Sequence, residues 1–523
     1  MNLALADDGS FTLPHLNYAA LLPILLLLGA AVVAVVIEAV APKPSRQLLQ
    51  VVLALVAMGG ALWSVIWQAT QFTRTARGTI TAGGAVAVDG PALFMQGTLL
   101  VLGILALLLV ADRSLERGGP FVAVAAVTAG TEADRVQAQR SPGNTDVFPL
   151  MLFALGGMLL FVAANDLLTM FVALEVFSFP LYLLCALARR RRLLSQEAAM
   201  KYFLLGAFAS AFFLFGIALV YGFANTVSFN GIYTAVLSSP NSKTLLIAGI
   251  SMIAVGLLFK AAAVPFHVWT PDVYQGAPTP ITAFMAACTK VAAFGGLLRV
   301  FYVAFYRANW DVAVIIGVVA VLTMLVGSIL AVAQTDVKRL LAYSSIANAG
   351  YLLLGVVAFS RDGLGSTMFY LVAYGFTIIA AFGVIMLVRD ADGEATHLSR
   401  WAGLGRRSPA YAGLFTFLML AFAGIPLTSG FMSKYYLFSA AQGSNQTWLV
   451  IIGVISSMVL AFPYLKVVVM MWLSEPGDTT PTVSVPGGLT KVALAIGGLV
   501  TLALGVAPSA ALDLAQSAAQ FLR

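Results

Sequence analysis

The stretch Leu258-Phe-Lys260-Ala-Ala-Ala-Val-Pro265-Phe-His267-Val-Trp269 decides how this chain folds. It places a lysine and a proline inside an apolar run that covers about residues 244–275. A charged side chain at the centre of a membrane helix costs roughly 2.5–3.5 kcal/mol on insertion scales, and a proline breaks the backbone ladder of a helix. The stretch therefore predicts an interrupted membrane helix with Lys260 near mid-depth.

The composition of the whole chain points the same way. Of 523 residues, 60% are hydrophobic and 10% are charged, and the mean hydropathy is +0.95. Soluble domains carry roughly 45–50% apolar and about 25% charged residues. A water-soluble fold of this length cannot bury so much apolar surface, which excludes a cytosolic enzyme and a nucleic-acid binder.

The apolar runs predict an all-α integral membrane protein with about 14 transmembrane helices. A bilayer core of roughly 30 Å needs about 20 apolar helical residues. The fourteen runs lie at about 17–40, 48–69, 91–111, 147–164, 167–188, 200–222, 244–275, 280–306, 311–332, 338–358, 365–388, 409–441, 446–473 and 488–507.

The basic residues predict the orientation. Seventeen of the 29 lie in the odd-numbered connections, and six lie in the even-numbered connections and the C-terminus. By the positive-inside rule, the odd connections face the cytoplasm and both termini face outside. Residues 1–8 contain no basic residue ahead of the first apolar run, which argues against a cleaved signal peptide.

A second interrupted run, Phe422-Ala-Gly424-Ile-Pro426-Leu-Thr-Ser-Gly430-Phe-Met-Ser-Lys434, predicts an internal repeat. Blocks 147–306 and 311–473 each hold five spans, and an odd number inverts the second copy. The predicted domains are residues 1–146 (three helices and a polar loop), the two inverted repeats 147–306 and 311–473, and a C-terminal helix in 474–523. Each break predicts a water-lined half-channel, because its freed backbone groups need polar partners.

Four ionisable residues are predicted to lie deep in the membrane: Glu175, Lys260, Lys290 and Lys434. Burial disfavours the charged form of a lysine, and a nearby carboxylate favours it. Two unit charges 4 Å apart interact by about 4 kcal/mol at an effective dielectric of 20. Lys260 is thus able to hold a proton while paired with Glu175 and to release it on separation. The alternative for each lysine is a snorkelling side chain or a structural ion pair.

Other ionisable residues in the spans have weaker signals. Lys201 lies at the start of its span beside Glu197, and His267 follows Pro265 at the break. His267 is either a proton relay or a hydrogen-bonded core residue. Arg299 is about twenty residues into its run and is predicted to snorkel to the far interface. No cysteine or histidine cluster has metal-ligand spacing, so we expect no metal or cofactor in this chain.

Three motifs carry a resemblance to a known family: Gly276-Ala-Pro278-Thr-Pro280, Ala286-Ala-Cys-Thr-Lys290, and Gln334-Thr-Asp336-Val-Lys338-Arg339 with its continuation to Asn348. They closely resemble antiporter-like subunit N of bacterial proton-translocating NADH–quinone oxidoreductase (respiratory complex I), over about residues 147–473. The resemblance implies an inner (plasma) membrane subunit that moves protons from the cytoplasm to the outside.

The resemblance also implies partners and roles. NADH, FMN, iron–sulfur clusters and quinone (ubiquinone or menaquinone) would lie in other subunits, and the antiporter-like subunit M and the small subunits A, J and K would adjoin this chain. Glu175 matches the carboxylate of the fifth span, Lys260 the central proton carrier, Lys290 the relay lysine and Lys434 the lysine near the outlet. The remaining matches are a histidine of the broken seventh span, His267, and a sixth-span lysine, Lys201.

The chain departs from the family pattern at two places. Asn348 stands where a histidine is expected, and because asparagine does not titrate, this predicts a water-mediated step. Segment 118–146 is long and polar, and reads as a cytoplasmic loop or partner contact, or as a disordered insertion. Two rival functions stay open: a subunit of a multisubunit Na⁺/H⁺ antiporter or membrane-bound hydrogenase, and a purely structural membrane scaffold.

Overall fold

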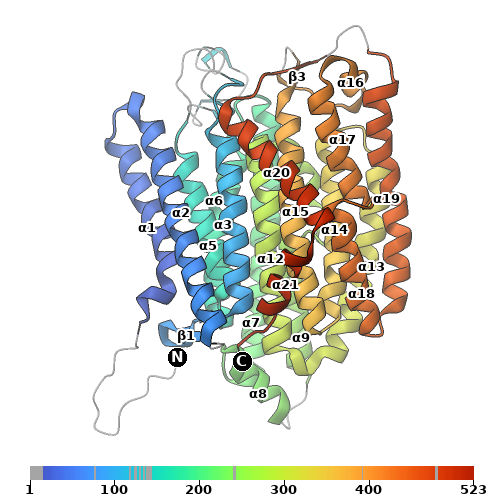
Figure 1. Ribbon diagram of the computed structural model, residues 1–523. Coiled ribbons are helices and arrows are strands. Elements are labelled where there is room, and N and C mark those ends of the chain that lie inside the picture. Colours follow the sequence, from blue (N-terminus) through green and yellow to red (C-terminus); the bar gives the residue numbers. More distant parts are fainter. Residues whose placement is uncertain are drawn as a thin grey trace.

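The computed structural model describes residues 16–75, 78–116, 119–122, 127–128, 131–133, 136, 144–238, 243–390, 393–476 and 481–522. This part of the chain is a bundle of long, roughly parallel helices (Figure 1). Twelve of its helices are long and apolar enough to cross a membrane, and two shorter apolar helices accompany them. Each of the fourteen predicted spans coincides with one or more of these helices. Most of segment 118–146 and its predicted role lie outside the described residues.

The elements fall into consecutive groups along the chain. The N-terminal group consists of α1 (Tyr18–Val40), α2 (Lys43–Thr75), β1 (Thr79–Thr81), η1 (Ala82–Gly84), β2 (Val86–Val88) and α3 (Gly90–Ala111). The next group consists of α5 (Val147–Ala163), α6 (Leu167–Cys185), α7 (Arg192–Ala224), α8 (Phe229–Ser238), α9 (Thr244–Ala261), α10 (Trp269–Gly276), α11 (Thr279–Phe284), η2 (Met285–Thr289), α12 (Lys290–Arg299), η3 (Val300–Ala304) and η4 (Tyr306–Ala308).

The remaining elements build the other half of the bundle. They are α13 (Asn309–Val332), α14 (Val337–Val357), α15 (Arg361–Leu387), β3 (Val388–Asp390), β4 (Gly393–Glu394), η5 (Leu398–Trp401), α16 (Leu404–Arg407), α17 (Pro409–Ala423), α18 (Ser429–Gly443), α19 (Thr447–Leu473), β5 (Thr482–Val483), α20 (Gly488–Val506) and α21 (Ser509–Ala518). Strands β1 and β2 form an antiparallel pair, and β3 pairs antiparallel with both β4 and β5.

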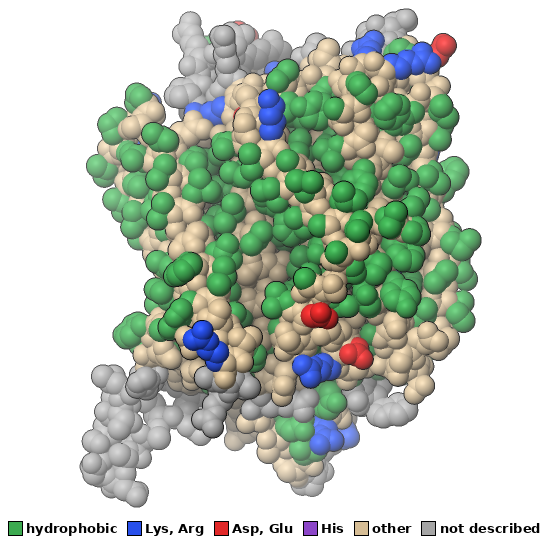
Figure 2. All heavy atoms as spheres, viewed as in Figure 1, with side chains coloured by type: hydrophobic (Ala, Val, Ile, Leu, Met, Phe, Trp, Pro, Cys, Tyr) green, Lys and Arg blue, Asp and Glu red, His purple; other side chains and the backbone are tan. Residues whose placement is uncertain are grey.

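The bundle has two faces, which we name from Figure 1. The upper face carries β3 and α16, and the lower face carries β1, α8 and the end of α21. Hydrophobic side chains cover a broad belt between these faces, and charged side chains gather toward the two ends (Figure 2). This distribution is the one expected of a multi-pass membrane protein.

Polar caps start several of the spans. The side chains of Asp89, Asp166, Asp336 and Ser360 accept hydrogen bonds from backbone N–H groups in the first turns of α3, α6, α14 and α15. Such caps satisfy donors that have no partner inside the helix. The helix starts are therefore set by short polar residues that directly precede apolar runs.

The centre of the bundle is formed by the span of α11 to α12, by α14 and by α15. The most apolar 18-residue stretch of the α11-to-α12 span is entirely buried. The corresponding stretches of α14 and α15 are 94% buried, whereas those of α1 and α19 are only one third buried. Residues on the central helices face other helices rather than lipid. A buried polar pathway is therefore expected along them.

Both predicted helix breaks are present. Helix α9 ends at Ala261, Ala262 adopts the left-handed conformation (φ 62°), and α10 begins at Trp269. Helix α17 ends at Ala423 and Gly424 caps it with φ 83°, a conformation that glycine adopts without strain. These breaks leave the last carbonyls of α9 and α17 available to side chains.

Candidate functional site

Lys260 lies in the last turn of α9, at the first break. Its side chain is buried, and its Nζ lies 5.1–5.8 Å from the centroids of four aromatic rings, those of Phe177, Tyr182, Tyr202 and Phe259. The faces of aromatic rings attract a cation. Among the described residues, Nζ has no hydrogen-bond partner. The ring cluster therefore accommodates both the charged and the neutral amine, and no hydrogen bond holds either form in place.

Glu175 lies on the neighbouring helix α6, within electrostatic range of Lys260. Its Oε1 is buried without a hydrogen-bond partner, and no ion pair within 4.0 Å joins it to Lys260 in the described part of the chain. The structure thus shows the separated arrangement of the predicted pair. Ser178 and Tyr182 follow Glu175 at helical spacing on α6 and place hydroxyls on the same side.

Lys290 begins α12, directly after the π-helical turn η2. Such turns are frequent at functional sites because they loosen the regular backbone ladder. The Nζ of Lys290 donates a 2.6 Å hydrogen bond to the carbonyl of Ser345 on α14 and lies 5.6 Å from the ring centroid of Tyr374 on α15. Lys290 therefore connects the two halves of the bundle.

Aromatic side chains fill the space from Lys260 toward Ser345. Tyr202 stacks on Trp269 with centroids 4.6 Å apart, and Trp269 contacts Tyr274 edge to face. Tyr274 and Tyr374 both lie near Ser345, and among the described residues neither the Ser345 nor the Tyr374 hydroxyl has a hydrogen-bond partner. The connection from Lys260 to Lys290 thus consists of rings and hydroxyls rather than of direct lysine contacts.

Asn348 lies on α14, three residues after Ser345, whose carbonyl accepts the hydrogen bond from Lys290. Its Nδ2 donates to the carbonyl of Ser344 at 2.8 Å, and its Oδ1 accepts a hydrogen bond from the hydroxyl of Tyr370. The hydroxyl of Ser344 is hydrogen-bonded to that of Tyr464 on α19. All four side chains are buried. This network spans α14, α15 and α19.

Lys434 lies in the first turns of α18, at the second break. Its Nζ donates to the carbonyls of Phe422 and Ala423, which end α17, and to the hydroxyl of Ser457 at 2.8 Å. A cavity of about 10 Å³ separates it from the network of Asn348; its polar lining consists of Asn348, Tyr370, Tyr374, Thr377, Ser429, Ser433 and Lys434. Such a space holds roughly one water molecule. We name it the inner cavity.

Lys201 and His267 lie apart from the row that Lys260, Lys290 and Lys434 form. Lys201 is 42% exposed and pairs with Glu197 and Asp272, both at 2.7 Å, and Asp272 also pairs with Arg339. His267 is half-buried in the break between α9 and α10, with its Nδ1 buried and without a hydrogen-bond partner among the described residues. The ion-pair reading fits Lys201 better than a deep carrier role.

A charged cluster at the upper face was not anticipated from the sequence. Lys338 pairs with Glu394 at 2.7 Å, and the hydroxyl of Thr279 donates to the same carboxylate. Burial opposes the charge on Glu394, but Lys338 and Thr279 outweigh it and hold the pKa of this carboxyl below its ordinary value. A cavity of about 60 Å³ adjoins the pair, which is room for water at the upper end of α11.

The prediction for Arg299 is wrong. Its side chain is fully buried, with its Nη2 2.6 Å from Asp89 and its Nε donating to the carbonyl of Val162 at 2.8 Å. The backbone N–H of Leu522 also donates to Asp89. A partner carboxylate and a complete set of hydrogen bonds make a buried charge tolerable, so snorkelling is unnecessary.

Sequence reasoning missed the hydroxyls between the lysines, those of Ser344, Tyr370, Tyr374, Ser457 and Tyr464. Serine and tyrosine are common in membrane helices, and none of these stands out alone. The usable signal was their helical spacing, since Ser344 and Asn348, and Tyr370 and Tyr374, are four residues apart and share a helix face. In the described residues, no group of three or more His, Cys, Asp or Glu side chains is placed to hold a metal ion.

Comparison with known proteins first defines the class. The family described as "NADH:quinone oxidoreductase/Mrp antiporter, TM" matches residues 164–459, which include every residue of the row. The fold is shared with a chain of the Mrp complex from a Dietzia species, at a TM-score of 0.79 and 24% identity, covering 96% of this chain and 97% of that one. The chain is thus an antiporter-like membrane subunit.

Sequence identity is more specific than fold. The chain is 67% identical to NADH-quinone oxidoreductase subunit N of Salinispora arenicola, over 98% of this chain and 99% of that protein. It is 31% identical to a chain of respiratory complex I from Thermus thermophilus, with a TM-score of 0.74 over 94% of this chain and 99% of that one. The chain belongs to the family of NADH-quinone oxidoreductase subunit N.

Proposed function

We propose that this chain translocates protons across a bacterial inner membrane as subunit N of an NADH–quinone oxidoreductase. The observation that supports this most is the buried row of Lys260, Lys290 and Lys434, in which hydroxyls and a water-sized cavity connect the last two. NADH oxidation and quinone reduction take place in other subunits, with FMN and iron–sulfur clusters there. Subunits M, A, J and K are the proposed neighbours.

The proposed path starts at Glu175 and Lys260. When the carboxylate approaches, Lys260 is favoured as the ammonium, and when it withdraws, burial favours the neutral amine. A proton released from Lys260 moves toward Lys290 along the side of Tyr202, Trp269 and Tyr274. Coupling to redox chemistry elsewhere in the enzyme is electrostatic, because a shift in one charge pair changes the proton affinity of the next.

Lys290 and Lys434 complete the path. The carbonyl that Lys290 contacts belongs to Ser345, three residues before Asn348. A water molecule in the inner cavity would bridge Asn348 and Lys434 and would replace the titrating histidine that the family resemblance predicts at this position. Asn348 then orients the water through its amide, and Tyr370 fixes the amide in turn.

The topology and the domains are part of the same proposal. The upper face is cytoplasmic and both termini lie outside, as the basic residues predict. Residues 147–306 and 311–473 act as two inverted half-channels, with 1–146 and 474–523 packed around them. His267, at the first break, is proposed as a proton relay of lesser importance, and Lys201 as part of the cytoplasmic ion-pair network.

The test is a Lys260→Ala variant of the intact enzyme in proteoliposomes. We expect the complex to assemble and NADH-driven proton uptake to fall several-fold, because an alanine at this buried position has no group that is able to carry the proton. Lys243→Ala, which removes an exposed lysine outside the row, is the matched control and should pump normally. A normal ratio of protons to NADH in Lys260→Ala would reject the proposed role.

An antiporter subunit is the second candidate, because the Mrp chain shares the fold at the higher TM-score. That likeness is at 24% identity and shows the fold alone. Purification of the chain with its native partners separates the two functions. Flavin and iron–sulfur subunits in the complex support the oxidoreductase, and small hydrophobic proteins alone support the antiporter.

A further inference from the structure

A large polar cavity opens at the lower face between α15, α18 and α21. Its volume is about 330 Å³, and its polar lining includes Ser360, Asp362, Ser366, Tyr436, Ser439 and Gln516. Asp362 is exposed and lies in the first turn of α15. We name this space the vestibule. Its size, hydroxyls and carboxylate make it a place for water rather than for a lipid chain.

The vestibule and the inner cavity lie in one groove. Helix α15 lines the vestibule with Ser366 and the inner cavity with Tyr370, and α18 lines them with Tyr436 and Ser433. These pairs are four and three residues apart, which is about 5–6 Å along a helix. The two spaces are therefore separated by about one helical turn.

One aromatic pair occupies that turn. The rings of Phe369 on α15 and Tyr436 on α18 meet edge to face, with centroids 6.1 Å apart and an angle of 86° between their planes. Phe369 is fully buried, whereas Tyr436 is half-buried and borders the vestibule. This ring pair is thus a contact between α15 and α18 at the level between the two spaces, and the Tyr436 ring is the member that borders the vestibule.

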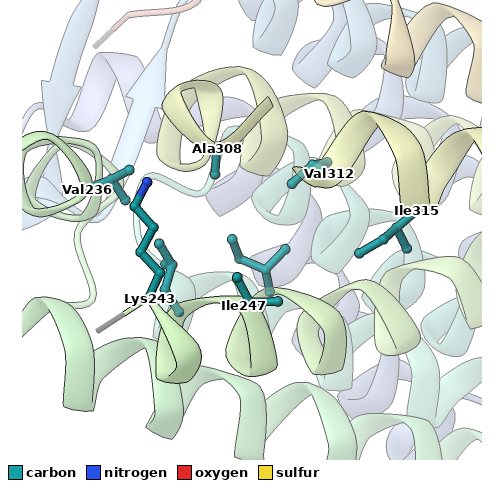
Figure 3. A pocket seen from close by; sticks show the side chains of 8 residues that line it. Val236, Lys243, Ile247, Ala308, Val312 and Ile315 are labelled. Atoms are coloured by element: carbon teal, nitrogen blue, oxygen red, sulfur yellow. The ribbon is translucent and has the colours of Figure 1, made fainter. Parts of the chain in front are cut away.

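At the lower end of the first half of the bundle, the described residues leave an opening of about 220 Å³ between α1, α2 and α3, lined in part by Asn17, Gln68, Gln71 and Thr79. No residue of α6, α9 or α12, the helices of Glu175, Lys260 and Lys290, lines it. Beside α12, the Arg299–Asp89 ion pair occupies the lower end and is covered by Phe521, whose ring centroid lies 4.9 Å from the guanidinium. A small pocket between α8, α9 and α13 is lined by apolar side chains except for Lys243 at its rim (Figure 3). A proton has no hydroxyl path through that pocket.

We propose that the vestibule is the release site of the translocated proton, with Phe369 and Tyr436 as its gate and Asp362 as the acceptor at its mouth. The inference rests on the proposed function, since it supplies the exit for Lys434. An N–H bond of the Lys434 ammonium breaks and an O–H bond forms on the Asp362 carboxylate through intervening water. The Asp362 carboxyl then gives its proton to bulk water, and both groups return to their starting charge in the next cycle.

Cysteine accessibility tests the gate. The native Cys185 and Cys288 are fully buried, so a thiol introduced at Ser439 in the vestibule or at Ser433 in the inner cavity is read by mass spectrometry of this subunit. With a membrane-impermeant cationic methanethiosulfonate added outside, Ser439→Cys should be modified about tenfold faster than Ser433→Cys, because modification follows access. Equal rates, or an unreactive Ser439→Cys, would overturn the proposal.

Removing the gate should abolish the slow modification of Ser433→Cys. In the background of Ser433→Cys, Tyr436→Ala should raise the modification rate about tenfold, because it removes the ring that separates the two spaces. Tyr221→Ala is the matched control, since Tyr221 is an exposed tyrosine on α7 that lines neither cavity. If Tyr436→Ala does not assemble, Tyr436→Leu replaces it. No increase with an assembled variant would reject the gate.

Proton pumping separates this inference from the proposed function. Asp362→Asn in the intact enzyme should lower NADH-driven proton release several-fold, because an amide accepts no proton, whereas Asp513→Asn on α21 should not. Normal pumping by Lys434→Ala would reject the proposed function itself. Loss of pumping in Lys434→Ala together with normal pumping in Asp362→Asn and unchanged labelling would reject only the outlet.

Discussion

Asn348 is the residue at which the two halves of the proposed path meet. Its amide is held from both sides, by the carbonyl of Ser344 and by the hydroxyl of Tyr370, and it borders the inner cavity. An amide in this position both donates and accepts, so it is able to orient a water molecule without taking up the proton. The proposed path therefore needs no histidine here, because the amide and one water molecule are able to connect its two halves.

Replacing Asn348 tests this role. Asn348→Leu should lower NADH-driven proton uptake several-fold, because it fills the water-sized space and leaves the Tyr370 hydroxyl without its partner, at a cost of roughly 1–3 kcal/mol. Asn348→Ser should keep most of the activity, because it leaves room for a second water. Proton uptake and NADH oxidation are measured on the same proteoliposomes. Equal activity of the Leu and Ser variants would contradict a water-mediated step.

Single residues differ in how clearly the sequence predicts their environment in the fold. The burial of Lys260, Lys290 and Lys434 was predictable, because a charge inside an apolar run is costly and rare and therefore faces protein rather than lipid. Arg299 has the same signal, but its partner Asp89 is 210 residues away, and no local pattern indicates such a pairing. The pairing of Glu175 with Lys260 stays a prediction, since helical spacing indicates the depth of the two residues but not the distance between their helices.

At the scale of elements, the breaks were predictable and their consequences were not. Pro265 and the run from Gly424 to Gly430 mark where α9 and α17 end. The sequence does not indicate which side chains take up the freed carbonyls. In the structure, Lys434 bonds to the end of α17, whereas the carbonyl of Phe259 accepts from the indole of Trp269. The two breaks are thus chemically different despite their similar position.

The junction of α3, α12 and the C-terminal residues gives a prediction at this scale. Arg299→Leu should destabilise the subunit by roughly 3–5 kcal/mol, because it leaves the charge of Asp89 buried and unpaired. Adding Asp89→Asn should recover much of the loss, since asparagine is neutral and still caps α3. Thermal denaturation of the purified complex measures both variants. A double variant as unstable as Arg299→Leu would show that the ion pair is not the cause.

At the scale of the whole molecule, the central helices combine the two halves into one path. Lys290 stands on α12 but bonds to α14, and the inner cavity is bordered by α14, α15, α17 and α18. The number and order of the spans followed from apolar length alone. Their packing did not, because an apolar run has the same composition whether it faces lipid or protein, and only assembly shows that α14 and α15 are central.

This arrangement predicts that the two broken helices act in series. Lys260→Ala and Lys434→Ala should each remove the full contribution of this subunit to the protons moved per NADH, and the double variant should lose no more than either single variant. Two independent parallel channels would instead make the losses additive, with roughly half of the total in each single variant. The ratio of protons to NADH in proteoliposomes of the three variants and of Lys243→Ala as control decides between them. Additive losses would contradict a single path, in which the proton leaves Lys260 through Lys290 and Lys434 because the Arg299–Asp89 ion pair occupies the lower end beside α12.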